Sequence, residues 1–107
     1  MPRPAGSSTS KTSRVARVVV AETAQRDLAD IVASRSLPDS TRDRVRAHLR
    51  PLATFPRLGR ELQDHWAPLR AIGGPWTWML LVYAYDESQD LVTVVTIADT
   101  RTASAPR

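Results

Sequence analysis

The chain has 107 residues and no cysteine, which favours one domain and excludes disulfides and thiolate metal sites. Its net charge of +4 is carried almost wholly by arginine, since Lys11 is the only lysine. A surplus of this size permits binding to nucleic acid, the ribosome or an acidic protein segment, and requires none of them. No run of about 18 apolar residues is present, so we expect no membrane span. The absence of cysteine fits a cytoplasmic protein.

The chain begins with a polar tail and a short apolar run. Residues 1–13 are rich in Pro, Ser and Thr and lack the apolar segment of a secretory signal, so we expect a disordered tail. The β-branched run Arg14–Ala21 predicts a strand. Because residues 18–20 are all valine, both faces of this strand are apolar, and we place it in the interior of a sheet.

Two amphipathic segments follow. Thr23 can cap a helix over residues 24–35, in which apolar residues recur at helical spacing. A second helix is expected over residues 40–55. Pro51 lies inside its pattern and predicts a kink or break near residues 47–50, because proline removes a helical hydrogen bond. The apolar stripe of this helix is Val45, Leu49, Leu52 and Phe55.

Three strands are expected to close the domain, at residues 67–72, 76–85 and 91–98, after a loop over residues 55–62. Alternation along the second strand places Trp76 and Trp78 on one face with Leu80 and Val82. The order β-α-α-β-β-β predicts an α+β fold in which a helical hairpin packs on a small, mainly antiparallel sheet. Residues 102–107 are expected to form a loose tail.

Four short motifs lie in order along the chain. They are Thr23-Ala24-x-x-Asp27-Leu28-x-x-Ile31, Leu52-x-x-Phe55-Pro56-x-Leu58-Gly59-x-x-Leu62, Leu69-Arg70 with a strand ending Leu81-Val82-Tyr83, and Val94-Val95-x-Ile97-x-Asp99-x-Arg101. With the element order, they resemble the RelE/ParE family of type II toxin–antitoxin toxins. The resemblance covers residues 14–101, which we take as the toxin domain.

The resemblance implies a growth-inhibiting toxin, often linked to plasmid stabilisation, that a cognate antitoxin neutralises. The antitoxin's extended tail wraps across the helical hairpin or along the sheet. One branch of the family cleaves mRNA in the ribosomal A site without a metal, and another blocks DNA gyrase by binding. No cofactor or metal is implied.

The sequence departs from the ribonuclease branch at most of its cationic positions. Metal-free RNA cleavage needs a base for the 2′-OH, cations for the transition state and an acid for the leaving oxygen. By the resemblance, that branch has lysines where this chain has Trp66 and Pro68, and an arginine at the position of Leu80. Its late tyrosine is absent from residues 100–107, and Arg101 alone stands near its expected place. These departures favour a binding inhibitor or a weakly toxic interaction module over a toxin that cleaves RNA.

Four residues remain as catalytic candidates. Arg70 and Arg101 lie near the ends of predicted neighbouring strands and can hold a phosphate between them. Alternatively, Arg70 forms a salt bridge with Asp99. Either Asp99 or His65 can act as the base, although a lone loop histidine is also compatible with a plain surface side chain.

The remaining candidates are binding residues. Arg42, Arg46 and Arg50 share one helical face, which suits an acidic or nucleic-acid partner and equally suits a solvated face paired with neighbouring aspartates. Two tryptophans on one strand face indicate either an antitoxin anchor or core packing. The binding candidates are Arg42, Arg46, Arg50, Arg57, Arg60, Trp76 and Trp78.

Three hypotheses follow. The first is an inhibitor that binds an essential protein, with gyrase as the family precedent. The second is a ribosome-dependent mRNA endonuclease, and the third is a weakly toxic interaction module of the same fold. Under all three, the cognate antitoxin is the expected partner.

Overall fold

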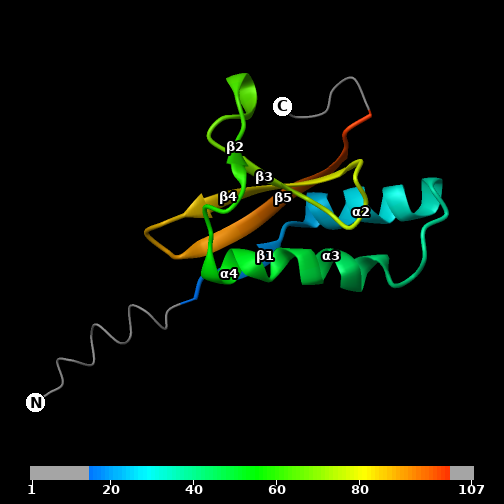
Figure 1. Cartoon of the computed structure of the whole chain (residues 1–107), viewed down its shortest axis with the longest axis horizontal. Coiled ribbons are helices and arrows are strands. Elements are labelled where there is room, and N and C mark those ends of the chain that lie inside the picture. Colours follow the sequence, from blue (N-terminus) through cyan, green and yellow to red (C-terminus); the bar gives the residue numbers. More distant parts are fainter. Residues whose placement is uncertain (1–14, 102–107) are drawn as a thin grey trace, which may run out of the picture.

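The computed structural model describes residues 15–101, so the expectations for residues 1–13 and 102–107 lie outside the described part of the chain. Two long helices lie beside one sheet (Figure 1). The elements in chain order are β1 (Arg17–Val20), α2 (Glu22–Ser34), α3 (Thr41–Leu49), α4 (Pro51–Thr54), β2 (Arg60–Glu61), the 3₁₀ turn η1 (Asp64–Trp66), β3 (Arg70–Gly73), β4 (Met79–Asp86) and β5 (Leu91–Asp99). None of the helices in this range is long and apolar enough to cross a membrane.

The sheet has five strands in the order β1-β5-β4-β3-β2. β1 runs parallel to β5, and the other neighbours are antiparallel, which confirms the mainly antiparallel α+β fold. The prediction that β1 lies in the sheet interior was wrong, because β1 forms an edge. Val18 and Val20 pack against the core while Val19 is 39% exposed, so three successive valines do not mean burial on both faces.

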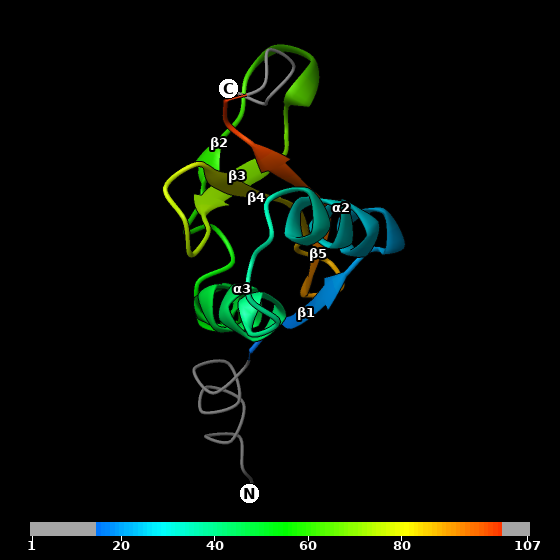
Figure 2. The same cartoon turned by 90° about the vertical axis from the view of Figure 1, so that its right-hand side faces the viewer.

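The two long helices run antiparallel over the same face of the sheet (Figure 2). α2 begins at Glu22 with Ala21 as N-cap, so the predicted cap at Thr23 was wrong. The predicted break in the second helix is confirmed. α3 ends at Leu49 and α4 begins at Pro51, where the missing N–H of proline costs least.

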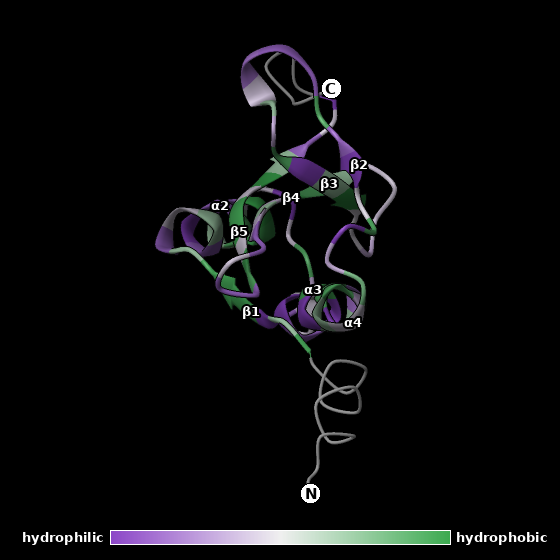
Figure 3. Ribbon diagram, turned by 90° about the vertical axis from the view of Figure 1, so that its left-hand side faces the viewer, coloured by the Kyte–Doolittle hydropathy of each residue, from purple (hydrophilic) through white to green (hydrophobic). Residues whose placement is uncertain are grey.

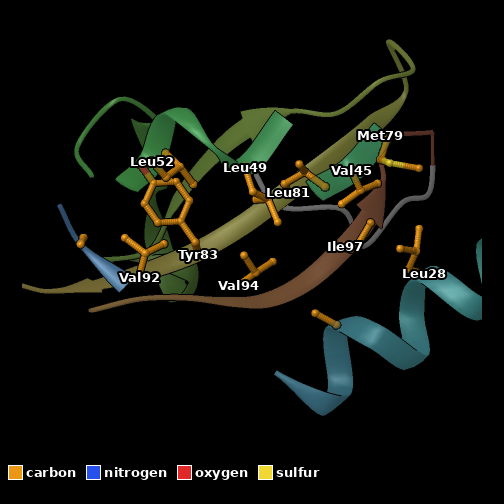
Figure 4. Packing of buried hydrophobic residues seen from close by; sticks show 12 residues of the cluster. Leu28, Val45, Leu49, Leu52, Met79, Leu81, Tyr83, Val92, Val94 and Ile97 are labelled. Atoms are coloured by element: carbon orange, nitrogen blue, oxygen red, sulfur yellow. The ribbon is translucent and has the colours of Figure 1, made fainter. Parts of the chain in front are cut away.

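Apolar side chains from the helices and from β4 and β5 form the main core (Figure 4). Its fully buried members include Leu52 of α4, Tyr83 of β4 and Val92 of β5. In Figure 3, β4 and β5 are mostly coloured as hydrophobic, whereas β2, part of β3 and much of α3 are coloured as hydrophilic. Burial of these side chains, worth about 1.5–3 kcal/mol each relative to exposure, holds the helices on the sheet.

A second, smaller cluster lies on the opposite face of β3 and β4. It consists of Leu62, Ala71, Leu80 and Val82, with Trp66, Leu69, Val95 and Ala98 packed against it. The segment between β2 and β3, which contains η1, supplies part of this cover. That segment is turned, so β3 begins at Arg70, later than the predicted residue 67.

Trp76 and Trp78 do not share a face with Leu80 and Val82, so that prediction was wrong. Both tryptophans precede β4 and pack against the helix-side core. The Met79 amide donates to the carbonyl of Trp76, so the turn after Gly-Gly-Pro continues up to the strand. Strand alternation therefore starts only at Met79.

The loop after α4 is fixed to the sheet through Tyr83. The backbone N–H of Gly59 donates to the Tyr83 hydroxyl at 2.8 Å, and the Gly59 carbonyl accepts from Arg70 Nη1 at 2.8 Å. Burial raises the pKa of Tyr83, so its hydroxyl stays protonated. A Cβ on Gly59 would lie 2.8 Å from the Tyr83 ring and from the Ala71 carbonyl oxygen, closer than these atoms can approach.

Gly59→Ala is therefore expected to lower the free energy of unfolding by about 1–3 kcal/mol, because the added methyl group meets fixed backbone and a buried ring. Urea unfolding at neutral pH measures this loss. Gly73→Ala is the matched control, because nothing lies within 4 Å of the Cβ it adds. Equal stability of the two variants would contradict the proposed contact.

Candidate functional site

Asp99, at the end of β5, joins two arginines. It accepts from Arg35 Nη2 at 2.6 Å, and from Nε, Nη2 and the backbone N–H of Arg101 at 2.9 Å each. Its side chain is 10% exposed, whereas those of Arg35 and Arg101 are 43% and 48% exposed. The hydrogen bonds and charge of Arg101, with the charge of Arg35, hold the pKa of Asp99 far below its usual range.

The same arginines stack on an aromatic pair. The guanidinium carbons of Arg35 and Arg101 lie 5.4 and 4.6 Å from the ring centroid of Trp78. Arg44 of α3 lies 5.5 Å from the ring of Trp76, and the two indoles are 6.2 Å apart. All three arginine distances fall within cation–π range. The two indoles thus bring together four parts of the chain: the end of α2, the middle of α3, the β3–β4 turn and the end of β5.

Arg70 lies elsewhere in the sheet. It pairs in register with Tyr83, whereas Asp99 pairs with Met79, four positions away along β4. That offset is about 13 Å along the strand, and two strand spacings add about 10 Å across it. Since Arg70 donates to the Gly59 carbonyl, the alternative salt bridge between Arg70 and Asp99 was wrong. The structure also does not bring Arg70 and Arg101 together around one phosphate.

His65 is exposed on η1, which projects from the body of the protein in Figure 1. Its ring contacts that of Trp66 at a centroid distance of 5.2 Å. The four catalytic candidates therefore divide among three places. Across residues 15–101, no group of three His, Cys, Asp or Glu side chains is placed to hold a metal ion.

A groove lies between α2 and α3, with Ile97 of β5 at its base. It is lined by Val20, Gln25, Leu28, Arg42, Val45, Arg46, Leu49 and Ile97. Two of the three arginines of the predicted stripe, Arg42 and Arg46, thus border an apolar surface. Arg50 lies at the junction of α3 and α4 and is not among the lining residues.

The other two binding candidates lie beyond this groove. Arg57 pairs with Glu87 at 3.0 Å and lies 5.1 Å from the ring of Tyr85. Arg60 is exposed on β2, opposite Ala71 in the register. Neither residue contributes to the groove or to the site at Asp99.

Sequence reasoning overlooked Arg35 and Arg44. Their partners, Trp78 and Trp76, are far away in the sequence, and no spacing rule connects a helix residue to a distant turn. Asp27, in contrast, belongs to the first of the four sequence motifs. Its carboxylate accepts from the Thr96 hydroxyl at 2.5 Å and so fixes α2 to β5.

Comparisons with known proteins agree with this architecture. The family model of the ParE toxin of the type II toxin–antitoxin system parDE matches residues 18–103. The chain therefore belongs to the ParE toxin family. No curated protein sequence matches.

Two solved structures share the fold. A double arginine-to-alanine mutant of Escherichia coli toxin RelE in the free state is 17% identical, with a TM-score of 0.59 over 83% of this chain and 87% of that chain. The toxin–antitoxin complex RelBE2 from Mycobacterium tuberculosis contains a chain that is 21% identical, with a TM-score of 0.55 over 79% of this chain and 98% of that chain.

The stabilising effect of Asp99 should depend on pH. Because its folded pKa is lowered, its contribution is complete above the unfolded pKa of about 4 and is lost as pH falls below that value. Asp99→Asn should therefore be less stable than the wild type at pH 7, and the gap should narrow by pH 3. Urea unfolding at both pH values measures the gap. The exposed Asp30→Asn is the control, and a gap that stays constant would contradict the assignment.

Proposed function

We propose that this toxin acts by binding an essential protein, with DNA gyrase as the family precedent, and does not cleave RNA. The observation that carries the proposal is the separation of the catalytic candidates. Arg70 is bound to the Gly59 carbonyl, His65 lies on the projecting η1 turn, and Arg101 is bound to Asp99. Metal-free cleavage needs its base, acid and cations around one phosphate.

The electrostatics of Asp99 support the same conclusion. A general base works best when its pKa lies near the working pH. Arg101 and Arg35 keep the pKa of Asp99 well below its usual range, so it is a poor proton acceptor at neutral pH. A gyrase-type target implies that the toxin works in the cytoplasm.

The groove between α2 and α3 is the proposed site of antitoxin neutralisation. Its apolar lining can bury one face of an antitoxin segment, and Arg42 and Arg46 at its border complement acidic side chains on that segment. We therefore expect the antitoxin to dock an acidic, amphipathic stretch along this groove.

Two measurements after expression in a bacterial host distinguish binding from cleavage. We expect cleaved gyrase–DNA complexes and loss of supercoiling activity, with no new mRNA ends on ribosomes. The Arg101→Ala variant provides the contrast, because codon-phased mRNA cuts that disappear in this variant would establish the endonuclease instead. Normal growth with neither signal would contradict both and support the third hypothesis, a weakly toxic interaction module.

The antitoxin site is tested by charge reversal. Arg42→Glu with Arg46→Glu should weaken binding of the antitoxin encoded by the adjoining reading frame by about 10- to 100-fold, because both substitutions place like charges against an acidic segment. Isothermal titration calorimetry measures the change. Arg17→Glu with Arg26→Glu is the matched control, since these exposed residues lie outside the groove lining. Equal weakening in both pairs would argue against the groove.

A further inference from the structure

The stacked arginines form a surface for which the proposed function gives no role. We call the set Arg35, Arg44, Trp76, Trp78 and Arg101 the arginine–tryptophan cluster. These residues come from the C-cap of α2, from α3, from the turn before β4 and from the residues just after β5, and four aromatic contacts connect them. The cluster is therefore a product of the tertiary fold.

Stacking fixes the guanidinium groups and leaves their donors usable. The guanidinium carbons lie 4.6 to 5.5 Å from an indole centroid, and such a cation–π contact does not use up the hydrogen-bond donors of the guanidinium. Arg101 uses Nε and Nη2 for Asp99, and Arg35 uses Nη2. Both side chains are close to half exposed, so their remaining donors can reach a ligand. Because the rings already hold these side chains in place, little rotamer entropy is lost on binding.

The charges at the cluster do not cancel. The cluster contains three guanidiniums, and two of them, those of Arg35 and Arg101, share the carboxylate of Asp99, so within residues 15–101 positive charge is in excess. Arg44 forms no ion pair with any residue in the range 15–101, although it stacks on Trp76. The surrounding segment is also positive, because residues 35–50 contain five arginines and two aspartates, Asp39 and Asp43.

A purely structural role accounts for only part of this arrangement. Arg35 and Arg101 connect the end of α2 to the end of β5 through Asp99, as a structural latch would. That latch needs neither Arg44 nor the second indole. An exposed guanidinium that pairs with no carboxylate of residues 15–101 is better suited to an anionic ligand, and phosphate matches its planar donors.

We propose that the arginine–tryptophan cluster binds the phosphodiester backbone of a nucleic acid. The surface is polar and positively charged, whereas the apolar groove lies between α2 and α3, so a mainly apolar protein segment fits the groove better. Phosphate contacts made by arginine position a protein on nucleic acid without reading its sequence. The proposal holds whichever essential protein the toxin binds.

Fluorescence anisotropy of the purified full chain tests the proposal, with labelled oligonucleotides of mixed sequence as probes. Wild-type protein should bind at low salt, and its affinity should fall with a slope in log salt of about −2 for single strands, as three phosphate contacts require. Arg44→Gln should reduce affinity about fivefold or more and make this slope shallower. Arg44→Lys should give an intermediate loss, because lysine retains the charge without the stacked fork. The same measurement with single-stranded and with duplex probes shows which form of nucleic acid the cluster prefers.

Arg26→Gln is the matched control, since it removes the same charge from an exposed helix site outside the cluster. Asp99→Asn provides a test in the opposite direction. It removes the carboxylate that pairs with Arg35 and Arg101 and should raise affinity severalfold, whereas a purely structural role predicts no gain. A thermal melt of each variant confirms folding.

Three outcomes would overturn the proposal. The first is no wild-type binding at low salt, and the second is an equal loss for Arg44→Gln and Arg26→Gln. The third is a folded Asp99→Asn variant whose affinity is unchanged or lower. The gyrase assay bears on none of these, so failure of the proposed target and failure of this site are distinguishable.

Discussion

The buried hydroxyl of Tyr83 joins parts of the chain that no helix or strand connects directly. It accepts the N–H of Gly59, and the carbonyl of the same glycine accepts from Arg70. The loop after α4 is thereby fixed across β3 and β4, and the helices are held over the sheet face that Tyr83 occupies. Leaving such a group buried without a partner costs about 1–3 kcal/mol, so the loop position is set by hydrogen bonding as well as by packing.

Local signals in the sequence predicted most of the fold. Helical spacing, the break at Pro51 and the turns between β-branched runs act within a few residues, and the predicted order of the two helices and four main strands is confirmed. The short strand β2 (Arg60–Glu61) was not predicted, because it lies in the segment expected to be a loop. The edge position of β1 was not predictable from its three valines, because sheet order depends on which strand pairs with β5. The prediction of which sheet face Trp76 and Trp78 occupy was wrong for a local reason, since the turn before β4 is longer than its Gly-Gly-Pro sequence indicates.

The candidate site was harder to predict. Asp99 and Arg101 are two residues apart, so their association could be inferred from the sequence, but Arg35 and Arg44 reach the same place only through the packing of α2 and α3. The arginines of α3 point in two directions, according to their positions around the helix. Arg42 and Arg46 border the groove, while Arg44 projects to Trp76. One short helix thus serves two surfaces of different chemistry.

The parallel pairing of β1 with β5 also affects the order in which the domain folds. Arg17 lies opposite Leu91, so the first strand of the fold pairs with a strand that begins 74 residues further along the chain. β5 also separates β1 from β4, and without it both helices lack much of the surface that they cover. Because such long-range pairings form late, we expect β1 and β5 to pair in one of the last steps of folding.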